Sequence, residues 1–153
     1  MTIENDLVQL LQAQIDAAGL QFEGKPAKIA VVEWTISRPA MFDQYLVRLN
    51  PDGTRNDAVV AVRQLKDTAS RYLQVKPHTN QTDYEIAVWL LVFYRENAEA
   101  YAVLREAIVN RVRNYFVNNP GVAQYKTCFV DDHLSGKSYN LASLITVTKT
   151  FRR

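Results

Sequence analysis

Two carboxylates, Asp83 and Glu85, stand two residues apart in a run of strand-like sequence. Side chains at that spacing share one face of a strand. Together with Asp131 or Lys137 they could surround a divalent ion and cleave a nucleic acid, as small metal-dependent nucleases do. Acidic residues at the edge of a strand also prevent unwanted edge-to-edge pairing, and the pattern favours this second, structural role.

The other residues with reactive or ligating side chains form no recognisable constellation. His78 and His133 are the only histidines, and they lie far apart in polar segments without the ligand spacing of a metal site. The run Ser135-Gly136-Lys137-Ser138 resembles the end of a phosphate-binding loop but lacks the earlier glycine, so a hairpin turn is the simpler interpretation. The single Cys128 stands in an apolar run and is expected to be a reduced, buried thiol. The sequence therefore predicts no catalytic residue, no metal ligand and no cofactor.

Length and charge point to one ordinary domain. The chain has 153 residues and a formal net charge of +2, which is too mild to indicate nucleic-acid binding. Its first residues are acidic where a signal peptide would be basic. The longest apolar run, residues 87–94, is too short to cross a membrane. We therefore expect a single domain over residues 1–153, made in a reducing cytosol and without a membrane partner.

The chain is organised around a strand and a helix that follow each other directly, from Thr82 to Asn118. Residues 82–94 alternate as a strand whose even-numbered side chains share one face, while the odd-numbered face begins charged and becomes apolar from Ala87. Asn97 is a suitable N-cap for a helix over residues 97–118. The apolar stripe of that helix has steps of three and four residues and comprises Tyr101, Leu104, Ile108, Val112, Tyr115 and Phe116.

The flanking segments predict one more helix and several strands. A first helix ends near Ala18, and Gly19 suits the left-handed position that follows a helix. Strands are expected over residues 28–37, 42–49, 123–130 and 138–151, with irregular chain at 77–81 and a loop at 131–137. Residues 58–65 fit a strand or a short helix, and residues 71–76 fit a weak strand. The order predicts an α+β fold, with a mostly antiparallel sheet and two main helices packed on one face.

Arg105 projects into the apolar stripe of the long helix, between Val112 and Phe116. Its stem could lie along the apolar surface while its guanidinium stays in water, as long basic side chains often do. Alternatively, it could form an ion pair with a neighbouring subunit. Both interpretations are open from the sequence.

The order of elements and the chain length resemble those of the tail terminator, or tail completion, proteins of long-tailed bacteriophages, including phages with Mu-type contractile tails. The resemblance lies in the N-terminal helix NDLVQLLQAQIDAAGL, the strand KIAVVEWTI, residues 84–116 and the final strand YNLASLITVTKTF. It spans nearly the whole chain, and residues 42–76 depart from it.

The resemblance implies a structural virion protein and not an enzyme. Members of that family form hexameric rings that cap the tail tube, end its polymerisation and provide the docking surface for the head. The implied partners are further copies of the chain, tail tube and sheath proteins, and head-to-tail connector proteins, with DNA passing through the ring without being read by sequence. The implied location is the neck end of the virion tail, after assembly in the host cytoplasm. The alternatives are a small metal-dependent nuclease encoded near phage genes and a non-catalytic adaptor domain.

A ring subunit must meet a neighbour on each side through two different surfaces. The final strand and residues 42–49 stand near sheet ends in the predicted order and alternate as edge strands do. Charged residues on such strands limit indiscriminate pairing. We therefore expect the interface with a neighbouring subunit or with the tube to contain Arg48, Arg105, Tyr139 and Lys149.

Overall fold

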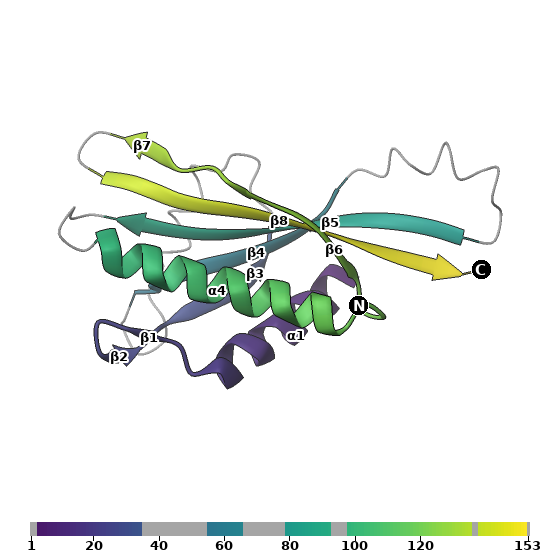
Figure 1. The fold of residues 1–153 in the computed structure, drawn as a ribbon, viewed down its shortest axis with the longest axis horizontal. Helices are drawn as coiled ribbons and strands as arrows, with labels where there is room; N and C mark the ends of the chain where they lie inside the picture. The colour runs from purple at the N-terminus through teal and green to yellow at the C-terminus, as the bar shows by residue number, and fades with distance from the viewer. Residues whose placement is uncertain (1–2, 35–54, 66–78, 93–97, 136–137, 153) are drawn as a thin grey trace.

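The computed structural model describes residues 3–34, 55–65, 79–92, 98–135 and 138–152 (Figure 1). Within these residues the elements are, in chain order, α1 (Ile3–Ala18), β1 (Gln21–Phe22), β2 (Lys25–Pro26), β3 (Ile29–Glu33), β4 (Ala58–Gln64), β5 (Thr79–Val92), α4 (Ala98–Asn118), β6 (Gln124–Val130), β7 (His133–Ser135) and β8 (Ser138–Arg152).

The main sheet has the strand order β3-β4-β5-β8-β6, and β7 also pairs with β8. β3 and β4 run parallel, whereas the pairings of β4 with β5, β5 with β8, and β8 with β6 and β7 are antiparallel. The ladder between β5 and β8 is the longest, since it extends without a shift from Thr79 opposite Arg152 to Val92 opposite Tyr139. These two strands therefore form the spine of the sheet.

The spine has two apolar faces, as the alternation of the sequence predicts. The even-numbered side chains of β5 from Tyr84 to Val92 belong to the larger core, which the helices share. The odd-numbered Ala87, Trp89 and Leu91 belong to a second, smaller cluster with Val59 and Ala61 of β4. Both faces of β5 are buried from Ile86 to Val92, and strands pair with β5 along both of its edges.

Both described helices lie on the same face of the sheet (Figure 1). α4 directs Leu104, Ile108, Val112 and Phe116 onto the strands, and each of these side chains is at most 2% exposed. α1 contributes three buried side chains at positions 7, 11 and 15, the spacing of one helical face. The described residues therefore form an α+β domain with the larger core between helices and sheet.

A small hairpin joins α1 to the sheet. Gly19 takes the left-handed conformation after α1, with φ of 60°, and Glu23 and Gly24 at the turn between β1 and β2 also have positive φ. Phe22 of this hairpin packs against Tyr101 of α4, with ring centroids 4.7 Å apart. Burial raises the pKa of the Tyr101 phenol, and the carboxylates of Asp57 and Glu23 raise it further.

The fold class predicted from the sequence is confirmed, with both helices on one face, although the parallel pair β3–β4 makes the sheet mixed. Residues 58–64 are a strand, which settles the choice left open between strand and helix. Two expectations were wrong: β5 begins at Thr79 inside the segment expected to be irregular, and the expected loop at 131–137 contains strand β7. The strands expected at 42–49 and 71–76 lie outside the described residues.

The position of β8 also differs from the expectation. The alternation of this segment predicted a strand near a sheet end, but β8 lies between β5 on one side and β6 and β7 on the other. Only Lys149–Arg152 extend beyond the pairing with β6, which stops at Gln124 opposite Thr148. Ser143 and Thr148 of β8 are each only 2% exposed, so these polar residues do not mark a solvent-exposed edge.

Removal of core volume under α4 tests this architecture. Leu104→Ala or Ile108→Ala should lower the free energy of unfolding by about 2–5 kcal/mol, because each leaves a cavity between helix and sheet. Urea unfolding followed by circular dichroism measures the change. Val103→Ala on the same helix is the control, since Val103 is 63% exposed and its loss should change stability by no more than about 0.5 kcal/mol. Equal stability of all three variants would show that the stripe is not buried.

Candidate functional site

The two acidic residues that could have served a nuclease are each engaged by the residue opposite them in the sheet. Glu85 of β5 faces Arg63 of β4 and forms an ion pair with it at 2.7 Å. Asp83 faces Thr148 of β8 and accepts a hydrogen bond from its hydroxyl. Arg63 is also fixed from the other side, because its guanidinium lies 3.7 Å from the ring centroid of Trp34. These contacts make the pair part of the sheet's structure.

Asp131, which was a further candidate for that hypothetical site, is not near these acids. The backbone N–H of Asp131 donates to the carbonyl of Ala142, which lies opposite Trp89. Trp89 is six residues along β5 from Asp83, a separation of about 20 Å. Lys137 and His78 lie outside the described residues. Within the ranges that the structure describes, no group of three His, Cys, Asp or Glu side chains could hold a metal ion.

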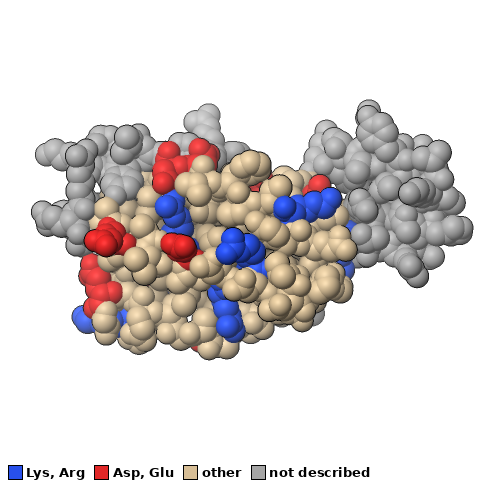
Figure 2. All heavy atoms as spheres, in the orientation of Figure 1, with Lys and Arg blue, Asp and Glu red and all other residues tan. Residues whose placement is uncertain are grey.

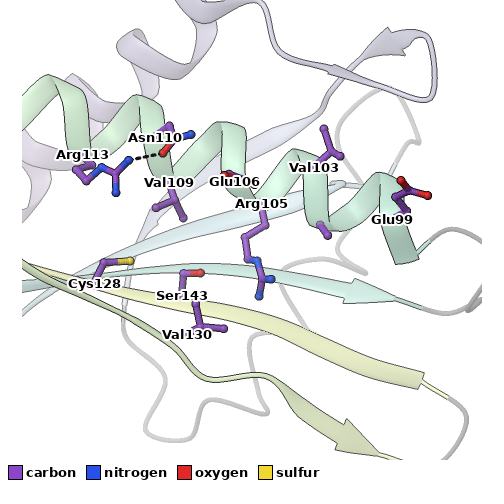
Figure 3. Close-up of a pocket in the computed structure, with 11 residues that line it drawn as sticks. Glu99, Val103, Arg105, Glu106, Val109, Asn110, Arg113, Cys128, Val130 and Ser143 are labelled. Atoms are coloured by element: carbon purple, nitrogen blue, oxygen red, sulfur yellow. Dashed lines mark hydrogen bonds between the residues drawn. The ribbon is translucent and has the colours of Figure 1, made fainter.

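A groove lies between α4 and the strands β6 and β8 (Figure 3). It has a volume of about 400 Å³. The small side chain of Ser143, buried on the helix side of β8, leaves room for it between Leu141 and Ile145 of the core. The described residues that line the groove are Glu99, Ala102, Val103, Arg105, Glu106, Val109, Asn110, Arg113, Cys128, Val130 and Ser143.

Arg105 crosses the groove from α4 and meets the end of β6. Its guanidinium contacts Asp132 Oδ1 at 2.6 Å, and the two side chains are 19% and 38% exposed. The same carboxylate oxygen accepts a hydrogen bond from the backbone N–H of Ala142 at 3.0 Å. Arg105 therefore has a partner in its own chain, and Asp132 holds α4, β8 and the link between β6 and β7 together.

The remaining polar groups of the groove do not resemble a catalytic set. Arg113 donates to Asn110 on its own helix at 2.6 Å. Burial raises the pKa of the Cys128 thiol, although Arg113 and Arg105 act in the opposite direction, so its nucleophilic thiolate is disfavoured. No histidine is among the described residues that line the groove. An apolar floor with a rim of both charges suits a contact with another polypeptide.

The four interface residues expected from the sequence fall in different places. Arg105 lines the groove. Lys149 lies at the beginning of the β8 segment that extends past β6, opposite Thr82. The backbone of Tyr139 pairs with Leu134 of β7 and Val92 of β5, away from a sheet edge. Arg48 lies outside the described residues. The structure does not bring Arg105, Tyr139 and Lys149 together on one surface.

Sequence reasoning missed the most exposed apolar residues of this region. Phe129 and Val130 at the end of β6 are 62% and 65% exposed, and Val103 on α4 is 63% exposed. Val103 and Val130 line the groove, whereas Phe129 lies opposite Leu144 of the second apolar cluster and so belongs to the other face of the sheet. Two consecutive apolar residues at a strand end were a signal, but a buried strand gives the same signal.

No family model matches this chain, and a search of characterised proteins also found no match.

A separate search covered the helices of the described residues. None of them is both long and apolar enough to cross a membrane.

The interaction between Arg105 and Asp132 can be measured by a double-mutant cycle. Asp132→Ala should cost about 1–3 kcal/mol of stability, because it leaves the buried N–H of Ala142 without its acceptor. Arg105→Ala should cost less, and the coupling energy between the two should be about 0.2–1 kcal/mol, since the ion pair is partly exposed. Chemical unfolding of both single variants and the double variant gives these values.

Glu106→Ala serves as the control, because it removes an exposed carboxylate from the rim of the same groove. A cost for Asp132→Ala no greater than that for Glu106→Ala would contradict the role of Asp132 as the residue that joins helix, strand and turn.

Proposed function

We propose that this chain is a structural subunit of a phage tail that assembles as a ring on the end of the tail tube. The ring stops tube polymerisation and provides the surface on which the head-side connector docks. The observation that carries the proposal is the groove beside β6, where exposed apolar side chains flank a strand at the border of the sheet. A surface of that kind suits lasting contact with another protein.

The chemistry of the described residues supports a non-catalytic role. The acids that share a face of β5 are occupied by Arg63 and Thr148, and the groove combines a thiol of raised pKa with both charges on its rim. A subunit of a ring needs rigid surfaces and no reactive group. The architecture of the described residues, with both helices covering one face of a long-stranded sheet, supplies that rigidity.

The proposal assigns partners as well as a role. Copies of the chain form the ring, proposed as a hexamer, with the tube and sheath proteins on one side and the head-to-tail connector on the other. DNA passes through the opening without sequence-specific contacts. Assembly takes place in the host cytoplasm, and the finished ring stays at the neck end of the tail.

Tube length tests the capping role directly. Tube protein from the same phage, polymerised without this chain, should give tubes of widely varying length, and addition of the chain should stop their growth. Negative-stain electron microscopy measures the lengths and shows whether a ring closes one end. A heat-unfolded sample of the chain is the control. Tubes that grow equally long in all three preparations would contradict the proposal.

Nuclease assays test the alternative that uses Asp83 and Glu85. We expect no cleavage of DNA or RNA with magnesium or manganese, and no change of the melting temperature on addition of EDTA, because both carboxylates are engaged within the sheet. Asp83→Ala is the diagnostic variant. Metal-dependent cleavage that is present in the parent and absent from Asp83→Ala would overturn the structural role.

A further inference from the structure

The main sheet has β3 at one border and β6 at the other, and the outward backbone groups of these two strands differ in their hydrogen bonds. At β3, the side-chain amide of Gln12 donates to the carbonyl of Ile29 at 3.2 Å and accepts from the N–H of Val31 at 3.0 Å. These two bonds are the ones that a neighbouring strand would make at this position, so α1 occupies part of this border. At the opposite border, β6 pairs with β8 alone among the described residues. Within the described part of the chain, α1 therefore occupies backbone groups at the β3 border, whereas no second strand pairs with β6, which we call the open border.

The register shows which backbone groups of β6 point outward. Just past the end of β6, the N–H of Asp131 donates to the carbonyl of Ala142. This bond shows which residues of β6 are hydrogen-bonded to β8 and which are not. Because hydrogen-bonded and non-bonded positions alternate in an antiparallel pair, Phe129 directs its N–H and C=O toward β8. Cys128 and Val130 then direct theirs away from it. The outward groups of these two residues can accept an added strand.

Exposed apolar side chains flank this open border on both faces. Val130 lies on the helix side with Val103, and Phe129 lies on the other face, and each is more than 60% exposed: 65%, 63% and 62% respectively. A strand that continued the sheet would cover both faces at once. A partner that forms backbone hydrogen bonds with β6 and also covers these apolar side chains must be an extended segment with an unpaired strand edge of its own.

The chain itself contains such a segment. The pairing of β4 with β5 ends at Tyr84, and the pairing of β6 with β8 ends at Thr148. Beyond these points, residues 79–82 and 149–152 pair with each other and extend past the rest of the sheet as a two-stranded ribbon (Figure 1). We call residues 79–82 and 149–152 the ribbon. Neither β4 nor β6 lies alongside it.

The two segments differ in charge. The far end of β6 leads into Asp131 and Asp132, of which Asp132 is paired with Arg105. On the rim of the groove, α4 carries Glu99 and Glu106 beside Arg105 and Arg113. The ribbon carries Lys149 and Arg152. Figure 2 shows acidic side chains gathered mainly in the left half of the helix face, whereas the ribbon extends from the opposite end of the molecule in Figure 1. The two surfaces therefore lie where a head-to-tail contact needs them.

We propose that the open border of β6 binds the ribbon of a second copy of this chain, so that the sheet continues from one subunit to the next. The contact is heterologous, since each subunit offers its β6 border to one neighbour and its ribbon to the other. The inference rests on the proposed function only for the statement that the series of contacts closes into a ring. The contact itself follows from the borders and charges described above.

Two variants separate the two halves of the contact. The border variant Phe129→Lys with Val130→Lys places charge on both faces of the open edge, which blocks strand addition. The ribbon variant Lys149→Glu with Arg152→Glu reverses the charge of the ribbon. Val117→Lys is the matched control, because Val117 is 57% exposed on α4 and does not line the groove. Circular dichroism checks that each variant folds.

Sedimentation velocity over a range of concentrations up to about 10 mg/mL measures association. We expect the parent and Val117→Lys to form species larger than a dimer, and each of the two contact variants to remain monomeric. An equimolar mixture of the two contact variants should form dimers and grow no further, because one intact border can bind one intact ribbon. A contact between two identical surfaces cannot give this result.

Val130→Pro provides a second route to the same conclusion. Proline at position 130 removes an N–H that points away from β8, so every hydrogen bond between β6 and β8 is kept. The substitution should therefore abolish association and leave the fold intact. A parent that stays monomeric throughout, contact variants that associate like the parent, or a mixture that grows beyond dimers would each overturn the inference.

The tube assay separates this inference from the capping role. If association depends on both surfaces but tube length does not respond to the parent, the capping role fails and the contact stands. If both contact variants still form rings and stop the tubes, the contact fails and the capping role stands.

Discussion

The unbroken pairing of β5 with β8 is the interaction on which the other features of this domain depend. It brings the C-terminal segment into the middle of the sheet, so that β4 adds on one side and β6 and β7 on the other. It places Thr148 against Asp83, and it presents Ser143 beneath α4 where the groove forms. At one end this pairing extends beyond the pairing of β4 with β5 and of β6 with β8, which produces the ribbon. A shift by one residue would exchange the two faces of β8 and remove all of these.

The sequence was sufficient to predict the elements whose pattern is long and regular. The alternation through Tyr84–Val92 and the stripe through Leu104 and Phe116 each repeat often enough to identify a strand and a helix, and the structure confirms both. Gly19 marked the end of α1 because few other residues accept a positive φ. In each of these cases the information is local, so neighbouring residues suffice to reveal it.

What the sequence could not supply is which elements become neighbours. The Thr-rich alternation of β8 is typical of a strand with one wet face, yet Thr148 meets Asp83 from a segment 65 residues away. Arg105 had two interpretations because its partner Asp132 is 27 residues away and lies beyond another strand. The groove likewise depends on the meeting of α4 with β6 and β8. β7 is too short, at three residues, for any period to show.

The hydrogen bonds of Gln12 have a consequence for the chain while it is being made. Gln12 precedes Ile29 and Val31 by 17 and 19 residues, so α1 leaves the ribosome before the strand whose border it covers. β4, the partner of β3 on its other side, is synthesised later. In a nascent chain the amide is therefore available as soon as β3 emerges, and it can occupy backbone groups that a second polysome-bound chain would otherwise pair with. The order of synthesis thus allows one border of β3 to be partly covered before β4 is made.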